Sequence, residues 1–302
     1  MKRIITNFLF GLIFLIGFGI LIYPTVSNVW NNYRQSHLIT SYEHVVSEMK
    51  VEDFSAEWER AQSFNERLPQ NNIYADAFGA ADTNLKDTEY WQVLNVGGDG
   101  VMGYLTIPKI NVKLAIYHGT EETVLQTGIG HLNGSRLPIG GESNHSVLAA
   151  HRGLPSAKLF TDIDQLKRGD MFYIYVLDQV LAYQVDLIWD MVDKDDSATL
   201  EEALSIIEGE DHVTLFTCTP YGVNSHRLLV RGTRVPYEGE EQVEAEVPES
   251  MVKSLQEESL FKLMVGLSVG LVAVWIIKFF IRIHYRRRWK KRRNIAFSKE
   301  EK

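Results

Sequence analysis

VTLFTCTPYGVNSHRLLVRG, residues 213–232, contains the only cysteine of the 302-residue chain. Residues 213–217 and 227–235 are rich in β-branched and apolar residues, and the segment between them carries Pro, Gly and Asn, which favour a turn. We therefore expect two strands that pair as an antiparallel hairpin. Such a hairpin would bring Cys218, at the end of the first strand, near Arg227, at the start of the second.

Similar runs of β-forming residues precede this hairpin in the sequence. They are VMGYLTIP (101–108), VKLAIYHG (112–119), HSVLAAH (145–151), MFYIYVL (171–177) and VLAYQVDLIWDMV (180–192). With the hairpin they make at least seven strands, which is typical of a barrel or sandwich of about 140 residues. We expect an Asp178-Gln179 turn between two of the strands, and one helix over 198–209 with Ser197 as its N-cap.

A single cysteine restricts the chemistry of the chain. It excludes an intramolecular disulfide and any zinc site that needs two thiolates. The sequence has no H-x-x-x-H or H-E-x-x-H spacing and no glycine-rich phosphate loop, so we expect neither a metal nor a cofactor. Cys218 is therefore a buried small apolar residue, a stray thiol or a nucleophile.

A nucleophilic thiol needs two kinds of partner. A nearby cation such as Arg227 raises the thiolate fraction of a thiol, which is ordinarily mostly protonated at neutral pH, and it can also stabilise an oxyanion. Acyl transfer further requires a proton donor for the leaving amine, usually a histidine. His151 is the best placed of the nine histidines, because it ends a β-run and meets a Gly/Pro turn. We expect surface or packing roles for His118, His131, His145, His212 and His226.

Two apolar segments lie near the ends of the chain. Residues 4–23 carry no charge over a length that reaches about 30 Å as a helix, the thickness of a bilayer's hydrocarbon core. Residues 263–281 are apolar except for Lys278, and the basic stretch 282–293 follows. Positive residues beside a span stay cytoplasmic, so we expect both termini inside and residues 24–262 outside. A cleaved signal peptide is the alternative for the first segment, although no A-x-A-like site follows it.

The charge of the chain is divided in the same way. Residues 24–261 carry 17 Lys and Arg against 37 Asp and Glu, whereas the terminal segments carry 14 against 2. Because the basic tail directly follows an apolar segment, we assign it to the membrane surface and expect no nucleic-acid partner. Apolar residues spaced by three to five over 26–68 predict two amphipathic helices. Residues 69–100 are weakly patterned and form a candidate lid region.

Two longer segments resemble the sortases, specifically the class C, pilus-assembling sortases of Gram-positive bacteria. They are SVLAAHRGLPSAKLFTDIDQLKRGD (146–170) and TLFTCTPYGVNSHRLLVRGTR (214–234), and the likeness covers roughly residues 26–237. The resemblance implies a mainly β fold: a closed eight-stranded barrel with short helices, an N-terminal helical region and two transmembrane helices. It also implies that Cys218 is the nucleophile, His151 the general acid/base, and Arg227 the group that binds substrate and stabilises the oxyanion.

The resemblance further implies a cysteine transpeptidase. Such an enzyme cleaves an LPxTG-like sorting signal of a pilin subunit, forms a thioacyl-enzyme and transfers the acyl group to a lysine amine of another pilin, which lengthens the pilus. A housekeeping sortase that attaches proteins to peptidoglycan is the nearest alternative. A cysteine peptidase, or a membrane-tethered scaffold module with a merely buried cysteine, are alternatives of other kinds.

Class C sortases usually carry a lid with an Asp-Pro-Phe or Asp-Pro-Trp motif. The corresponding triplet in this chain is Asp76-Ala77-Phe78, which lacks the proline. We expect Asp76 to pair with Arg227 and Phe78 to cover Cys218 in the resting enzyme. Loss of the fixed φ of proline predicts a more mobile loop. The alternative is a connector in which the aspartate and phenylalanine are incidental.

These interpretations divide the chain into seven segments. They are a membrane anchor (1–25), juxtamembrane helices (26–68), a lid region (69–100), the catalytic barrel (101–237), an acidic linker (238–260), a C-terminal transmembrane helix (261–281) and a basic cytoplasmic tail (282–302).

Overall fold

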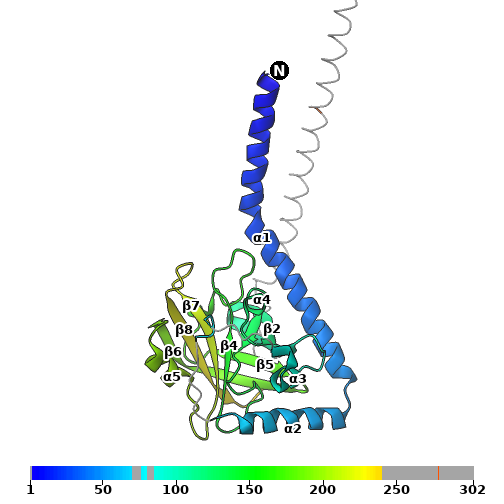
Figure 1. The fold of residues 1–302 in the computed structure, drawn as a ribbon, viewed down its shortest axis with the longest axis vertical. Helices are drawn as coiled ribbons and strands as arrows, with labels where there is room; N and C mark the ends of the chain where they lie inside the picture. Colours follow the sequence, from blue (N-terminus) through cyan, green and yellow to red (C-terminus); the bar gives the residue numbers. More distant parts are fainter. Residues whose placement is uncertain (1, 70–75, 80–84, 240–277, 279–302) are drawn as a thin grey trace, which may run out of the picture. The chain divides into compact units, whose positions relative to one another are not determined.

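The structure is a computed structural model of the chain and describes residues 2–69, 76–79, 85–239 and 278 (Figure 1). Its α-helices are α1 (Lys2–Glu48), α2 (Val51–Arg67), α3 (Glu89–Gln92), α4 (Glu122–Leu125) and α5 (Ser197–Leu204). Its 3-10 helices are η1 (Leu85–Asp87), η2 (Pro108–Ile110) and η3 (Ile163–Gln165). Its strands are β1 (Val101–Ile107), β2 (Val112–His118), β3 (Ile129–His131), β4 (Asn144–Ala149), β5 (Met171–Val176), β6 (Gln179–Asp193), β7 (Asp211–Thr219) and β8 (His226–Val235).

The eight strands close into a barrel in the order β1-β2-β3-β4-β7-β8-β6-β5. The β2/β3 and β4/β7 pairs are parallel, and the other neighbours are antiparallel. Closure removes the exposed strand edges that an open sheet of this size would leave. The closed eight-stranded barrel is the architecture that the resemblance implied.

Side chains alternate between the two faces of the barrel wall, as the period of two in a strand requires. Leu215 and Val230 belong to a large apolar cluster that contains residues of all eight strands and fills the barrel. Their neighbours Phe216 and Leu229 belong to a second cluster on the outer face, together with buried residues of α5. The candidate functional site lies on this outer cluster.

Helices α1 and α2 pack on the barrel through residues after the apolar N-terminal stretch. Ile39 and Tyr42 of α1 are buried against β1 and β2, and the Tyr42 hydroxyl donates to the Met102 carbonyl at 3.1 Å. Helix α2 crosses one end of the barrel (Figure 1), where the indole N–H of Trp58 donates to Asp178 at 2.8 Å. The region just before the barrel is therefore attached to it at both helices.

Several sequence expectations about local structure need correction. The chain has a single helix from Lys2 to Glu48 that continues through Pro24, so no break separates the apolar segment from the following helix. The turn between β5 and β6 consists of Leu177 and Asp178, since Val176 pairs with Gln179. Helix α5 ends at Leu204, well before residue 209. Its N-cap is Asp196, whose carboxylate accepts a hydrogen bond from the Thr199 N–H at 3.1 Å. The helix therefore begins at Ser197, one residue earlier than expected.

Strand β3 is absent from the strands that the residue pattern predicted. It has only three residues, too few for alternation to be visible, and it forms because β2 and β4 flank it on both sides. By length and composition, the helix over residues 8–48 could cross a membrane. The expected second span, linker and basic tail lie outside the described residues, apart from residues 238, 239 and 278.

Candidate active site

Cys218 and Arg227 lie directly opposite each other on β7 and β8. They are partners in the antiparallel register, which confirms the predicted hairpin. Cys218 lies two residues after Phe216, and Arg227 lies two residues before Leu229. Side chains two residues apart on a strand share a face, so both lie on the outer face of the barrel wall. Cys218 is 5% exposed and Arg227 is 4% exposed. The strand pairing thus fixes a guanidinium beside the thiol.

His151 reaches this face from the end of β4. The β4/β7 pairing extends past the strand, because the Ala150 N–H donates to the Phe216 carbonyl at 3.2 Å. The Thr217 hydroxyl donates to the Ala150 carbonyl at 2.7 Å, and the Phe160 N–H donates to the His151 carbonyl at 3.2 Å. The backbone that carries the imidazole is therefore held on both sides.

The loop that follows His151 is tied back to β7. Arg152 donates to the Thr161 carbonyl and to the Thr219 hydroxyl, both at 3.1 Å, and forms an ion pair with Asp164. Thr219 is the residue after Cys218, so Arg152 joins the histidine loop to the cysteine strand.

The turn at residues 76–79 lies on the candidate site. The Asp76 carboxylate receives two hydrogen bonds from Arg227, one from Nε at 2.9 Å and one from Nη2. It also accepts from the Phe78 N–H at 3.3 Å, which gives the turn an Asx-type geometry without proline. Ala77, at the position of the missing proline, is 1% exposed. The expected contact between Asp76 and Arg227 is thus present.

The ring of Phe78 contacts two of the candidate catalytic residues and the outer cluster beside the third. Its centroid lies 5.3 Å from that of the His151 imidazole and 5.4 Å from Cζ of Arg227. It also stacks on Phe216 at 5.8 Å between centroids, two residues before Cys218 on the same face. Phe78 therefore rests on the side chains that surround the thiol, as a covering residue would.

The environment of the thiol opposes its ionisation. Burial raises the pKa of Cys218 to about 11, against an ordinary value of 9.0. Arg227 acts in the opposite direction and Asp76 adds to the rise in pKa. The neighbouring cation thus acts in the expected direction, but burial outweighs it while residues 76–79 are in place. The thiol in this arrangement is protonated at neutral pH.

Sequence reasoning missed a contact of His151. Its Nε2 lies 3.2 Å from Oε2 of Glu122, the first residue of α4. No local pattern could reveal this contact, because the two residues are 29 positions apart and meet only when β3 and β4 have formed.

The other histidines behave as packing residues, as expected, in three clear cases. His118, His131 and His145 are buried and each has a ring nitrogen near a main-chain carbonyl oxygen. Burial lowers the pKa of all three. Arg231 lies on the same face of β8 as Arg227 but pairs with Asp186.

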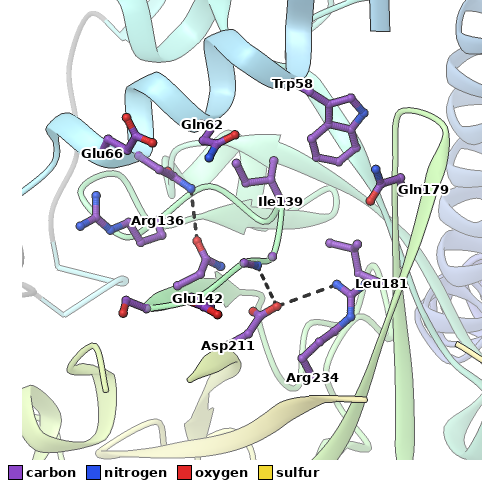
Figure 2. A pocket seen from close by; sticks show the side chains of 15 residues that line it. Trp58, Gln62, Glu66, Arg136, Ile139, Glu142, Gln179, Leu181, Asp211 and Arg234 are labelled. Atoms are coloured by element: carbon purple, nitrogen blue, oxygen red, sulfur yellow. Dashed lines mark hydrogen bonds and ion pairs between the residues drawn. The ribbon is translucent and has the colours of Figure 1, made fainter. Parts of the chain in front are cut away.

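A separate polar cavity of about 990 Å³ lies at the other end of β7 (Figure 2). Asp211, the first residue of β7, lies at its base and accepts from the Gly141 N–H at 2.9 Å, with Arg234 at 3.9 Å. Seven residues of extended strand, about 23 Å, separate Asp211 from Cys218. This cavity is therefore distinct from the candidate active site.

Comparison with known proteins gives consistent results. Residues 105–235 match the family model of the sortase domain. Sortase D of Bacillus subtilis (strain 168) is 30% identical over 136 residues, 44% of this chain and 63% of the relative. Sortase A of Bacillus anthracis is 28% identical over 137 residues, 45% of this chain and 60% of the relative. The match thus spans less than two thirds of these two relatives.

Solved structures match over a longer part of the chain. Sortase C of Streptococcus pneumoniae is 45% identical, with a TM-score of 0.61 over 67% of this chain and 97% of that one. Sortase C1 of Streptococcus agalactiae is 46% identical, with a TM-score of 0.59 over 67% and 100% of the two chains. At this identity and coverage the likeness extends beyond the fold.

Proposed function

Because the chain belongs to the sortase family, we propose that it is a cysteine transpeptidase with Cys218 as nucleophile, His151 as general acid/base and Arg227 as oxyanion donor. One observation carries this assignment of roles. The thiol and the guanidinium are register partners, and the imidazole and the guanidinium contact the same phenyl ring. Three chemically complementary groups from β4, β7 and β8 therefore meet on one face.

The reaction begins when residues 76–79 leave the site. Their departure frees Arg227 from Asp76 and removes part of the burial that raises the pKa of Cys218. The thiol then transfers its proton to His151, and the thiolate attacks the carbonyl carbon of the Thr–Gly bond in an LPxTG-like peptide. Arg227 donates to the oxyanion of the tetrahedral intermediate. His151 returns the proton to the departing glycine amine, which leaves a thioester between the peptide and Cys218.

The thioester conserves the acyl energy, so the second half of the reaction needs no nucleotide. An incoming amine attacks the thioester carbonyl, His151 accepts a proton from that amine, and the Cys218 sulfur leaves and takes this proton from His151 to become the thiol again. We assign the amine to a lysine of another pilin subunit, which makes an isopeptide bond and lengthens a pilus. Two similarities support this assignment. The sortase C of Streptococcus pneumoniae has been studied for its pilin substrate specificity, and a similar sortase C1 belongs to a pilus island.

Mass spectrometry of the protein incubated with an LPxTG-type peptide tests the first half-reaction. We expect a mass increase equal to that of the peptide fragment up to threonine less one water, formed on wild type and faster on an Asp76→Ala, Phe78→Ala variant. Cys218→Ala should form none. An unmodified mass for both the wild type and the Asp76→Ala, Phe78→Ala variant would refute the proposed nucleophile. An adduct that still forms on Cys218→Ala would refute it as well.

Product analysis separates pilus polymerisation from anchoring to the cell wall. The thioacyl-enzyme is offered purified pilin and a wall-peptide amine at equal concentration. Predominant pilin dimer supports the pilus assignment. Predominant wall-peptide product would identify a housekeeping sortase instead.

We also propose that the protein is a two-pass membrane protein with an extracellular catalytic domain and cytoplasmic termini. The apolar helix over residues 8–48 supports the first span. The single cysteine allows a direct test in cells. A membrane-impermeant thiol reagent should label Cys218 of the Asp76→Ala, Phe78→Ala variant in intact cells, and protection until lysis would contradict this topology.

A further inference from the structure

We propose that Glu122 is a positioning residue for His151, holding the Nε2 edge of the imidazole so that Nδ1 is the nitrogen that exchanges protons during transpeptidation. The inference rests on the proposed function, since it assigns a role within the same site. Its basis is a chain of contacts that runs from α4 to the candidate catalytic histidine.

The contact itself joins a carboxylate to one defined ring nitrogen. Oε2 of Glu122 lies 3.2 Å from Nε2 of His151. The histidine side chain is 17% exposed, whereas the glutamate side chain is 64% exposed. Within the described part of the chain, Nδ1 of His151 forms no hydrogen bond. One nitrogen is thus occupied and the other is available to a reacting group.

The carboxylate is oriented by a second side chain. Nε2 of Gln126 donates to Oε1 of Glu122 at 2.7 Å, across one turn of helix. Each carboxylate oxygen therefore has one partner, and the oxygen that faces His151 is the one that Gln126 does not occupy. An exposed glutamate with a single contact would sample many rotamers, but two partners on opposite oxygens restrict it.

The short helix that carries Glu122 is itself anchored. Leu125 is 1% exposed and belongs to the outer cluster with Phe216. Gln35 of α1 donates to the Thr127 carbonyl at 2.6 Å and accepts from the Ala115 N–H at 2.9 Å. These contacts attach the C-terminal end of α4 to the barrel and to α1, one turn from Glu122, so the carboxylate is presented from an anchored support.

The chemical consequence concerns the tautomer of His151. A carboxylate at Nε2 accepts a hydrogen bond from that nitrogen and so favours the tautomer with its proton on Nε2. Nδ1 is then the basic nitrogen that takes the thiol proton and later gives it to the glycine amine. The carboxylate also stabilises the imidazolium cation that exists between these two transfers. Solvent screens this charge interaction, because Glu122 is largely exposed.

The first test reads the tautomer without relying on turnover. Ring ¹⁵N shifts of histidine are measured by NMR on the full chain in detergent micelles, with His151→Gln to assign the signal. We expect the Nε2–H tautomer in wild type, retention in Glu122→Gln, whose amide oxygen can still accept, and a mixture in Glu122→Ala. Glu121→Gln is the matched control, since it removes the adjacent charge without touching His151. Identical shifts in Glu122→Ala and wild type would overturn the inference.

The second test reads the reaction in the Asp76→Ala, Phe78→Ala background, where the site is open. Because the interaction is solvent exposed, we expect Glu122→Ala to lower kcat by about threefold to tenfold at unchanged KM, the range of a partly screened charged hydrogen bond. Gln126→Ala should cause a smaller loss and Glu122→Gln should recover part of the rate. Equal kcat for Glu122→Ala and Glu121→Gln would also overturn the inference. If the parent itself forms no acyl-enzyme, the proposed function fails, and the tautomer measurement still decides the role of Glu122.

Discussion

Removing the two side chains that lie over the site should uncover the thiol. Asp76 accepts two hydrogen bonds from Arg227. The ring of Phe78 contacts His151, Arg227 and Phe216. In the Asp76→Ala, Phe78→Ala variant these contacts are lost, while the strands that carry Cys218 and Arg227 are untouched. We therefore expect alkylation of Cys218 to become faster and to begin at lower pH.

The size of this effect follows from the pKa of the thiol. Burial, the largest cause, and Asp76 raise it to about 11, against an ordinary 9.0. At pH 7 this difference lowers the thiolate population about 100-fold, a factor of ten for each pKa unit. Loss of both side chains removes the Asp76 contribution and part of the burial, while Arg227 continues to lower the pKa, so the pKa falls from about 11 toward its ordinary value. A thiolate of lower pKa is also less nucleophilic, with a Brønsted coefficient of about 0.4–0.5, so ionisation alone should raise the alkylation rate by up to about tenfold.

Intact-mass spectrometry after timed exposure to iodoacetamide measures this rate, and the single cysteine makes the signal specific. The wild-type rate should keep rising up to about pH 11, whereas the rate of the variant should level off at a lower pH. Asp87→Ala, in the same region and exposed, is the matched control. Equal rates and equal pH profiles for wild type and the double variant would show that residues 76–79 do not control the thiol.

Three further substitutions test other parts of the site and fold. Ala77→Pro restores the proline of the lid motif and should slow thiol alkylation about twofold to fivefold, the equivalent of ~0.4–1 kcal/mol of loop entropy; an unchanged rate would mean that the Asx-type turn already supplies the stiffness. Arg227→Lys keeps the charge but loses the planar fork that binds Asp76, so we expect alkylation to accelerate while acyl-enzyme formation with an LPxTG-type peptide falls about 100-fold or more; full retention of acylation would remove Arg227 from the oxyanion role. Tyr90→Phe removes a buried hydroxyl that accepts from the Gly119 N–H at 2.9 Å, and urea unfolding should show a loss of about 1–3 kcal/mol, whereas Tyr221→Phe at an exposed position should show none.

Local pattern was sufficient for the strands that carry the site. Runs of β-branched and apolar residues on both sides of a Pro/Gly/Asn turn predicted the β7/β8 hairpin, and the pairing of Cys218 with Arg227 follows directly from it. The same logic located His151, because a strand that ends at a Gly/Pro turn places its last side chains at the end of the barrel. Chemistry then selected these residues, since one thiol, one base and one cation are what acyl transfer requires.

Local pattern failed where an element depends on its neighbours. Strand β3 has three residues and exists because β2 and β4 supply hydrogen bonds on both sides. The start of α5 depended on the choice between two adjacent capping residues, and Asp196 was preferred over Ser197. The N-cap of α5 depends on a difference of about 1 kcal/mol between two capping residues, and β3 depends on strands distant in sequence. Residue propensities alone resolve neither.

The sequence by itself therefore determined seven of the eight strands, the three proposed reacting groups and the membrane-length apolar segment, because each is encoded in residue type and short-range period. Only the tertiary structure decided the state of those groups. Burial beneath residues 76–79 reverses the effect that Arg227 alone would have on the pKa of Cys218, and a carboxylate 29 residues away takes one edge of His151. Both effects act through space in a medium of low polarity, so they depend on which atoms surround a group and not on which residues precede it.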